Sequence, residues 1–389
     1  MLRYAVIGVG NMGSVHAAKL FEGAVDNAVL TAVCDVEPEK LARMKELFSD
    51  KVAYYSDYHK LLDSKAADAV IIATPHYLHP VIAKEAFEKG WHVLTEKPAG
   101  VDAGSAAEMN EAAKKSGKAF GIMFNQRTNP LFSTLKYYID LGVLGEIKRF
   151  VWIISNWYRT QSYYDSDGWR ATWKGEGGGV LINQCPHNLD IWQWIMGMPE
   201  KVRAVCIPGH FHKIDVEDDA TIFAEYANKA TAVFITSTGE YPGTNRIEIS
   251  GTMGKAVAEN GKLSLWLLNR DERVIRDENP EAMPKEPVCE ICIPFEEKED
   301  GHIKILRNFT EHILSGKELT APGEEGIKSL TISNAAYLSS WKNETVSLPF
   351  DNSEFLEELA KQHDTRREKK ANKEADSVSE YSDRWKVNW

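Results

Sequence analysis

The stretch that decides the fold is Met1-Leu-Arg-Tyr-Ala-Val-Ile-Gly-Val-Gly-Asn-Met-Gly13, an apolar run that leads directly into the pattern Gly8-x-Gly10-x-x-Gly13. It predicts a strand over Tyr4–Val9 and a helix over Asn11–Phe21. In such a unit the first glycine allows a tight turn, the second lets the backbone approach a pyrophosphate, and the third lets helix pack closely on strand. The helix N-terminus then offers unpaired N–H groups to phosphate oxygens. The stretch therefore predicts a dinucleotide-binding site.

A carboxylate follows at the distance that this unit requires. A second strand is predicted over Leu30–Asp35 and ends in Asp35, about twenty residues beyond the glycines. The Asp35 side chain would accept hydrogen bonds from the adenosine ribose and repel a 2′-phosphate. No Arg or Lys follows it before Lys40. The sequence therefore favours NAD over NADP as the cofactor.

Strand and helix patterns alternate as far as Asn125-Gln-Arg127. The other predicted elements in this part are the strands Ala69–Ala73, His92–Thr95 and Ala119–Met123 and the helices Pro38–Phe48, Tyr77–Lys89 and Ser105–Ser116. Such alternation is typical of an α/β fold with a parallel, doubly wound sheet. Residues 1–125 are therefore predicted to form an N-terminal Rossmann domain.

Residues 126–345 have a different pattern, in which period-two strands dominate. The predicted strands are Ile147–Ile154, Val202–Ile207, Thr221–Tyr226, Ala230–Thr236, Arg246–Ser250, Lys255–Ala258 and Leu263–Leu267, and the predicted helices are Leu131–Leu141, Ile303–Leu314 and Glu324–Trp341. Sequential strands joined by short turns favour a mostly antiparallel sheet. The amphipathic helices Ile303–Leu314 and Glu324–Trp341 are expected either to cover a face of this sheet or to return to the first domain. This part is therefore predicted to be a second α/β domain.

Residues 346–389 become polar and charged beyond about Asp351 and include the run Arg366-Arg-Glu-Lys-Lys370. A charge run is typical of a solvated helix or tail. Trp385 and Trp389 favour docking, on this chain or on another subunit, because aromatic side chains often anchor contacts. We therefore expect a charged tail or a docking segment.

Length and composition limit the possible functions. A chain of 389 residues is too long for one ordinary core, which favours two domains. A net charge of −11 argues against nucleic acid or an anionic membrane as partner, and no apolar run is long enough to span a bilayer. The first residues already belong to a strand, so no signal peptide and a cytoplasmic location are expected. Cys289-Glu-Ile-Cys292 is interpreted as two unrelated thiols on a strand, and no metal site is predicted.

Two motifs follow predicted strands of the first domain, namely Ala73-Thr-Pro-His76 and Glu96-Lys97-Pro98. Ligands bind at the carboxyl ends of strands in open α/β sheets. Beside a positively charged nicotinamide the pKa of Lys97 would fall, so this lysine could donate to a substrate oxygen or transfer a proton; the alternative is an ordinary surface lysine. The candidate cofactor contacts are Gly8, Gly10, Asn11, Met12, Gly13, Asp35, Thr74, Pro75, His76, His79, Glu96, Lys97, Asn125, Trp169 and Arg170.

A third motif lies in the second domain, where Gly175-Glu-Gly-Gly-Gly precedes a stretch with a helical pattern that ends at Gly197. Pro186 within it marks a kink or a new helix start. Helical spacing would place Asn183, His187 and Asp190 on one face. His187 could then act as a general base while Asn183 holds a substrate hydroxyl. The alternative is that His187 and Asp190 only brace a helix end.

Together these motifs resemble the Gfo/Idh/MocA family of NAD(P)-dependent oxidoreductases. The motifs that carry the resemblance are Gly8-Val-Gly-Asn-Met-Gly13, Ala73-Thr-Pro-His-Tyr-Leu-His79, Thr95-Glu-Lys-Pro98, Trp169-Arg170 and Gly177-Gly-Gly-Val-Leu-Ile-Asn-Gln-Cys-Pro-His-Asn-Leu-Asp190. The resemblance implies a Rossmann domain followed by an α/β domain with an open, largely antiparallel sheet that forms a dimer or tetramer interface. It also implies that Lys97 and His187 are the acid/base pair.

One residue departs from the family pattern, because many members carry Asp where this chain has Asn183. An amide cannot relay a proton as a carboxylate can, but it can hold a hydroxyl by hydrogen bonds. Asn183 is therefore expected to orient the substrate.

The stretch Trp157-Tyr-Arg-Thr-Gln-Ser-Tyr-Tyr-Asp165 resembles the subgroup of the family that acts on pyranosides and anhydrosugars. Aromatic rings cover sugar C–H faces while polar side chains fix hydroxyls. An interdomain or subunit contact is the alternative for this segment. The candidate substrate contacts are Asn183, Arg127, Tyr158, Tyr163, Trp169 and Asp190.

The sequence therefore predicts an NAD-dependent dehydrogenase that oxidises a secondary hydroxyl of a sugar, glycoside, anhydrosugar or cyclitol. Two alternatives stay open. One is an NAD-dependent glycosidase that oxidises C3 transiently and retains its cofactor. The other is a regulator that senses a dinucleotide without catalysis, against which the presence of both Lys97 and His187 speaks.

Overall fold

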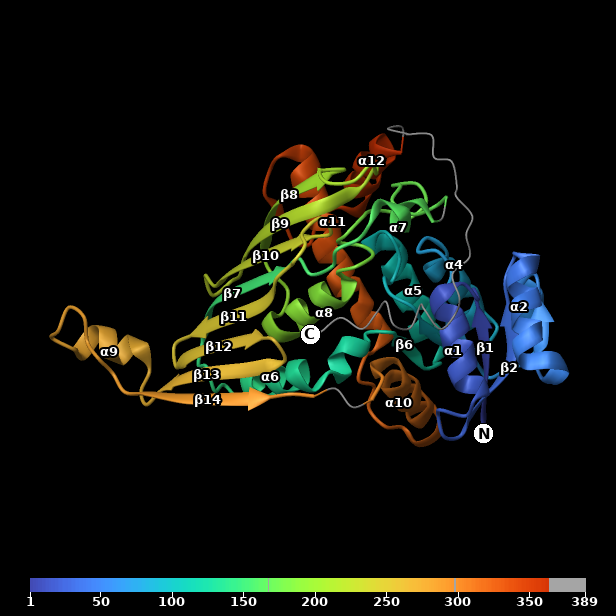
Figure 1. The fold of residues 1–389 in the computed structure, drawn as a ribbon, viewed down its shortest axis with the longest axis horizontal. Helices are drawn as coiled ribbons and strands as arrows, with labels where there is room; N and C mark the ends of the chain where they lie inside the picture. Colours follow the sequence, from blue (N-terminus) through green and yellow to red (C-terminus); the bar gives the residue numbers. More distant parts are fainter. Residues whose placement is uncertain (167, 297–298, 364–389) are drawn as a thin grey trace.

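A computed structural model describes residues 1–166, 168–296 and 299–363. The chain forms two sheets that lie side by side, with helices between them (Figure 1). Within the described residues, no helix has the length and apolar character needed to cross a membrane.

The first sheet has six parallel strands in the order β3-β2-β1-β4-β5-β6. Its strands are β1 (Leu2–Ile7), β2 (Ala28–Cys34), β3 (Ala53–Tyr55), β4 (Ala69–Ile72), β5 (His92–Thr95) and β6 (Phe120–Ile122), and its helices are α1 (Asn11–Phe21), α2 (Pro38–Phe48), α3 (Tyr58–Asp63), α4 (Leu78–Glu88) and α5 (Ala103–Ser116). This strand order is that of a dinucleotide-binding Rossmann fold and confirms the predicted fold class. All four residues of β4 are buried, as expected for a strand covered on both faces.

The second sheet has nine strands in the order β14-β13-β12-β11-β7-β10-β9-β8-β15. They are β7 (Ile147–Ile154), β8 (Lys201–Pro208), β9 (Glu217–Glu225), β10 (Thr231–Ser237), β11 (Asn245–Gly251), β12 (Gly254–Glu259), β13 (Lys262–Leu268), β14 (Val288–Pro294) and β15 (Val346–Ser347). Neighbouring strands are antiparallel except β7 and β10, which run parallel. The sheet is therefore mostly antiparallel, as predicted.

Helices α6 (Pro130–Asp140), α8 (Pro186–Met196) and α11 (Gly326–Lys342) lie on the face of the second sheet that is turned toward the first domain (Figure 1). Trp192 of α8 stacks between Phe150 of β7 and Phe234 of β10, with ring planes within about 10° of parallel. This aromatic contact holds α8 against the centre of the sheet.

The chain returns to the first sheet after the second has been built. Helix α10 (Gly301–Ser315) places Ile305, Leu306 and Phe309 in the core of the first domain. Gly121 of β6 forms a β-bridge with Pro322. The two layers therefore do not correspond to two uninterrupted pieces of chain, and of the two placements expected for this helix the return to the first domain is the one observed.

Three sequence-based expectations need correction. Pro186 is a new helix start, one of the two possibilities that the sequence left open, and α8 begins there. Asn183 lies in the preceding turn and therefore does not share a helix face with His187 and Asp190, contrary to expectation. Strand β3 and helix α3 were missed because both are short. The segment after residue 345 begins as β15 and α12 (Asn352–Gln362), whose Phe355 and Leu359 are buried in the second core. The run Arg366–Lys370, Trp385 and Trp389 lie outside the described residues.

Candidate active site

The glycine turn after β1 has the shape of a phosphate cradle. A Cβ on Gly13 would lie 1.7 Å from the backbone oxygen of Gly8. Gly8 itself has a φ of +86°, and a Cβ on it would lie 2.6 Å from the backbone oxygen of Ala73. A Cβ on Gly10 would meet nothing within 4 Å. Gly10 is the N-cap of α1 and has no side chain, so the cap residue supplies no side-chain acceptor to the N–H groups of the first turn. These features fit the diphosphate of a dinucleotide.

Asp35 follows β2 at the edge of the same cradle. Its two carboxylate oxygens accept hydrogen bonds from the backbone N–H groups of Val9 at 2.9 Å and Glu37 at 3.0 Å, which fix its position. The next cation, Lys40, pairs with Glu37 at 2.6 Å. A carboxylate held this way, beside a second acidic residue, suits the ribose hydroxyls of NAD and disfavours a 2′-phosphate.

The loop after β4 contacts the second domain through His76. The His76 Nδ1–H donates to the backbone oxygen of Glu176 at 2.8 Å, and the His76 ring packs edge-on against Trp169. The ring nitrogens of His79 lie 2.8 Å from the oxygen of Pro98 and 2.7 Å from that of Thr74. His79 therefore braces the two loops that follow β4 and β5.

The motif after β5 places two charged groups in the interior. Glu96 accepts a hydrogen bond from His16 Nε2 at 2.7 Å. Burial alone would raise the pKa of Glu96, but this hydrogen bond and the nearby positive charges lower it to about 2. The Lys97 ammonium donates to the backbone oxygen of Asn183 at 2.8 Å. Burial lowers the pKa of Lys97, which makes proton transfer from it easier.

His187 occupies the first turn of α8 and is 9% exposed. Burial, aided by the positive charge of Lys97, holds the pKa of His187 well below its usual value. Its ring is therefore neutral near pH 7 and able to accept a proton. Its Nδ1 is buried without a hydrogen-bond partner among the described residues.

A further carboxylate, which sequence reasoning missed, lies beside Asn183. Glu176 is 1% exposed, and its Oε1 accepts a hydrogen bond from Asn183 Nδ2. The hydroxyl of Tyr163 lies 3.4 Å from Asn183 Nδ2 and accepts from Arg170 Nη1 at 3.1 Å. The signal for Glu176 in the sequence was its place directly before three glycines, Gly177–Gly179. From the sequence, it is interpreted only as part of this glycine-rich turn.

Two candidate substrate contacts are bound to each other. Arg127 donates to both oxygens of Asp190, at 2.8 and 2.6 Å, and both side chains are 1% exposed. Arg127 also donates to Glu325 at 2.5 Å. This bidentate pair fixes α8, three residues beyond His187, to the short helix η2 (Asn125–Thr128). In this geometry Arg127 and Asp190 hold η2 and α8 together.

The aromatic candidates lie around the same region. Trp169 faces the guanidinium of Arg170 at 4.7 Å, and Tyr163 faces it at 5.1 Å. Tyr158 is 43% exposed and contacts Tyr241, which is 83% exposed. Tyr158 therefore stands at the surface, whereas Tyr163 and Trp169 lie deeper, beside Arg170.

Several buried polar atoms of these loops have no hydrogen-bond partner among the described residues. They include Thr74 Oγ1, Asn125 Oδ1, Gln184 Oε1 and His187 Nδ1. A buried polar group without a partner costs free energy, so such a cluster is expected where a polar ligand completes the hydrogen bonds. The residues therefore fit NAD and a hydroxylated substrate.

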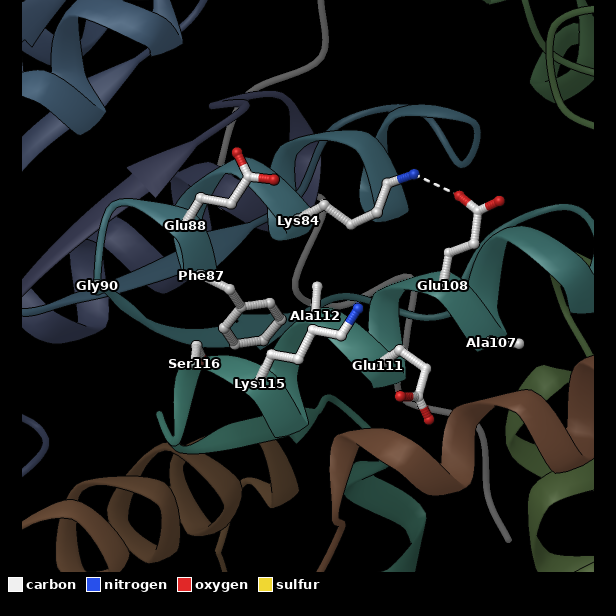
Figure 2. A pocket seen from close by; sticks show the side chains of 10 residues that line it. All are labelled: Lys84, Phe87, Glu88, Gly90, Ala107, Glu108, Glu111, Ala112, Lys115 and Ser116. Carbon is white, nitrogen blue, oxygen red and sulfur yellow. Dashed lines mark hydrogen bonds and ion pairs between the residues drawn. The ribbon is translucent and has the colours of Figure 1, made fainter.

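A separate hollow lies between α4 and α5 (Figure 2). It is lined by Lys84, Phe87, Glu108 and Lys115, among others, and Lys84 pairs with Glu108 at 2.6 Å. None of the predicted site residues contributes to it.

Comparisons with known proteins agree with this geometry. Residues 2–124 match the family described as oxidoreductases with an NAD-binding Rossmann fold, and residues 132–257 match the GFO/IDH/MocA C-terminal domain. The myo-inositol 2-dehydrogenase of Thermotoga maritima is 27% identical over 89% of this chain and 98% of its own length. The levoglucosan dehydrogenase of Pseudarthrobacter phenanthrenivorans is 27% identical over 66% of this chain and 73% of its own length.

Among solved structures, the WlbA dehydrogenase of Chromobacterium violaceum, in complex with NADH and UDP-GlcNAcA, superposes with a TM-score of 0.77. It is 29% identical, and the match covers 90% of this chain and 96% of that one. The glycine cradle, the Asp35 carboxylate and both family matches lead to the same conclusion: this chain belongs to the Gfo/Idh/MocA family and is an NAD-dependent oxidoreductase.

Proposed function

We propose that the protein oxidises a secondary hydroxyl of a sugar, glycoside, anhydrosugar or cyclitol. The observation that carries this proposal is the approach of Lys97, from the first domain, to the turn that holds Asn183 in the second. The two residues meet at the carboxyl end of β5, where a nicotinamide and an alcohol carbon would have to meet. The relatives named for myo-inositol and levoglucosan support this substrate class.

In the proposed reaction His187 removes the hydroxyl proton, because its buried ring is neutral and has an unused nitrogen. Lys97 donates a hydrogen bond to the same oxygen and stabilises the negative charge that develops on it. Bound NAD supplies the hydride acceptor at C4 of its nicotinamide. Asn183 orients the hydroxyl, and Tyr163 and Trp169 cover the C–H face of the ring.

The direct test follows NADH absorbance with cyclitols, aldoses, methyl glycosides and anhydrosugars, with NADP in parallel. Turnover of at least one of these alcohols is expected with NAD. Lys97→Ala and His187→Ala should each abolish that turnover while NADH still binds, as measured by fluorescence. Undiminished turnover in both variants would contradict the assigned roles.

We also propose that the open face of the second sheet joins copies of this chain into a dimer or tetramer. Val205 and Ile207 of β8 and Phe223 of β9 are between 36% and 57% exposed. The register of β8 and β9 brings these side chains to one face, opposite the helices. Adjacent apolar side chains that are exposed on a sheet face support a protein–protein contact there.

A further inference from the structure

The contacts of Asn183 define which of its side-chain atoms is available to a ligand. Nδ2 donates to Glu176 Oε1 and lies 3.4 Å from the hydroxyl of Tyr163. The backbone oxygen of Asn183 is bound by Lys97 at 2.8 Å. Because Glu176 binds the amide nitrogen Nδ2, the amide oxygen Oδ1 points away from Glu176 and is the atom that can accept a hydrogen bond from a ligand.

Glu176 is itself held in one position. Its Oε2 accepts the backbone N–H of Ala171 at 2.5 Å, and its backbone oxygen accepts from His76. Arg170 Nη1 lies 3.9 Å from Oε1. The carboxylate therefore accepts hydrogen bonds on both oxygens, and its orientation determines that of the amide.

We propose that Glu176 is a positioning residue of the active site, whose carboxylate turns the Asn183 amide so that its oxygen accepts the hydrogen bond of the reacting hydroxyl. This inference rests on the proposed dehydrogenase function. Asn183 and Glu176 together then present one acceptor oxygen and one negative charge beside Lys97. A single aspartate at position 183 would supply the same oxygen and the same charge without help from Glu176.

The chemistry of the pair predicts the effect of each single substitution. In Glu176→Gln the new amide can face either Ala171 N–H or Asn183 Nδ2 with its oxygen, but not both, so one N–H group loses its acceptor or the Asn183 amide turns over. In Asn183→Asp two carboxylates face each other, and one of them must hold a proton.

The double substitution Glu176→Gln with Asn183→Asp restores the hydrogen bond between the two side chains, with donor and acceptor exchanged. The glutamine side chain introduced by Glu176→Gln would accept from Ala171 N–H through its oxygen and donate through its nitrogen to the new aspartate. The second oxygen of this aspartate would still face the substrate as an acceptor. One negative charge stays in the site, so the double variant is expected to recover activity that each single variant loses.

The experiment is a double-mutant cycle on kcat/KM with the alcohol that the wild type oxidises. Each single substitution is expected to reduce kcat/KM by about 10- to 100-fold, from the loss of one charge-assisted hydrogen bond. The double variant should return to within about tenfold of wild type. Glu108→Gln, an exposed carboxylate on α5, is the matched control and should leave kcat/KM unchanged.

A pH profile separates positioning from a purely structural role. Asn183→Asp should be most active at low pH and lose kcat/KM as the pH rises and the carboxylate pair loses its shared proton. The charged and titratable groups around the pair include Arg170, Lys97, Tyr163, Tyr164 and His76. This profile also tests the proposal if Glu176→Gln does not fold, which thermal unfolding would reveal.

Two results overturn the inference. Losses that simply multiply in the double variant, or a pH profile of Asn183→Asp that matches wild type, show that Glu176 does not act through Asn183. If wild-type protein oxidises no alcohol in the NADH screen although it binds NADH, the proposed function fails first and the inference fails with it.

Discussion

Lys97 and Asn183 belong to different domains, yet the Lys97 ammonium donates a 2.8 Å hydrogen bond to the Asn183 backbone oxygen. His187 lies four residues beyond this contact, in the first turn of α8. The contact therefore joins the cofactor domain to the turn that precedes α8, the helix that carries the proposed base. It also means that removing Lys97 changes the electrostatic surroundings of His187.

Lys97→Met should reduce kcat by about 100-fold or more, because a preorganised donor to the developing alkoxide is lost. The same change should raise the pKa of His187, since the positive charge of Lys97 is one cause of its depression. Histidine NMR titration would measure that pKa in both proteins. In wild type the acid limb of kcat/KM should lie below pH 6.5, because the base works only when neutral. An unchanged His187 titration in Lys97→Met would contradict the coupling.

The cofactor preference should depend on Asp35. Replacing Asp35 by Ser and Val36 by Arg removes the repelling carboxylate and adds a cation at an exposed position. kcat/KM with NAD should fall and that with NADP should rise, each by about 10- to 100-fold. Val36→Ala is the control for the second position. A variant that keeps the wild-type preference would show that Asp35 does not select the cofactor.

Gly13 should contribute to the stability of the fold, whereas Gly10 should contribute to cofactor binding. Gly13→Ala would place a Cβ within 1.7 Å of the Gly8 oxygen and should destabilise the fold by about 3 kcal/mol or more. Gly10→Ala has open space for its Cβ, so the protein should fold normally but bind NADH more weakly. Urea unfolding and NADH titration distinguish the two. Equal stability of both variants would refute the predicted packing.

Glu217 should control the stability of the glycine turn 177–179. Its carboxylate accepts from the N–H groups of Gly179 and Leu181, both at 2.9 Å, and from the hydroxyl of Tyr337 at 2.7 Å. Glu217→Gln turns one acceptor into a donor and should cost about 1–3 kcal/mol in urea unfolding. Glu225→Gln, exposed on the same strand, should cost nothing measurable.

The difference in stability between wild type and Glu217→Gln should also depend on pH. Burial raises the pKa of Glu217 from 4.5 to about 7. Between these values the folded protein keeps a proton that the unfolded chain has released, so this group's contribution to stability falls as the pH rises from 4.5 to 7. The stability of wild type relative to Glu217→Gln should therefore decrease over that range. A constant difference would contradict the raised pKa.

The proposed subunit contact can be tested on the sheet face. Phe223→Glu places a charge beside the exposed Val205 and Ile207 of β8 and should convert the oligomer to monomer, as measured by light scattering after gel filtration. Leu47→Glu, similarly exposed on α2, should leave the mass unchanged. A wild-type protein that is already monomeric would disprove the contact.

Much of the fold was predictable because it depends on local patterns. The parallel sheet followed from alternating apolar runs, and the cradle from three glycines whose spacing leaves little room for another conformation. Local patterns left open whether Pro186 kinks a longer helix or starts a new one, because the turn from Gly179 to Cys185 has apolar spacing like that of a helix. They left two placements open for the helix over Ile303–Leu314, and the structure decides for the return to the first core.

The residues of the candidate site also divide into those that local sequence patterns revealed and those that only tertiary contacts revealed. The sequence by itself determined the cofactor cradle and the place of Asp35, because the cradle acts through the backbone of one strand–turn–helix unit and Asp35 directly follows the next strand of the same sheet. Only the tertiary structure decided that Arg127 binds Asp190, that Lys97 reaches Asn183, and that Glu176 holds the Asn183 amide. These contacts join residues from different elements, and the burial that sets the protonation of His187 and Lys97 exists only once the two sheets have packed together.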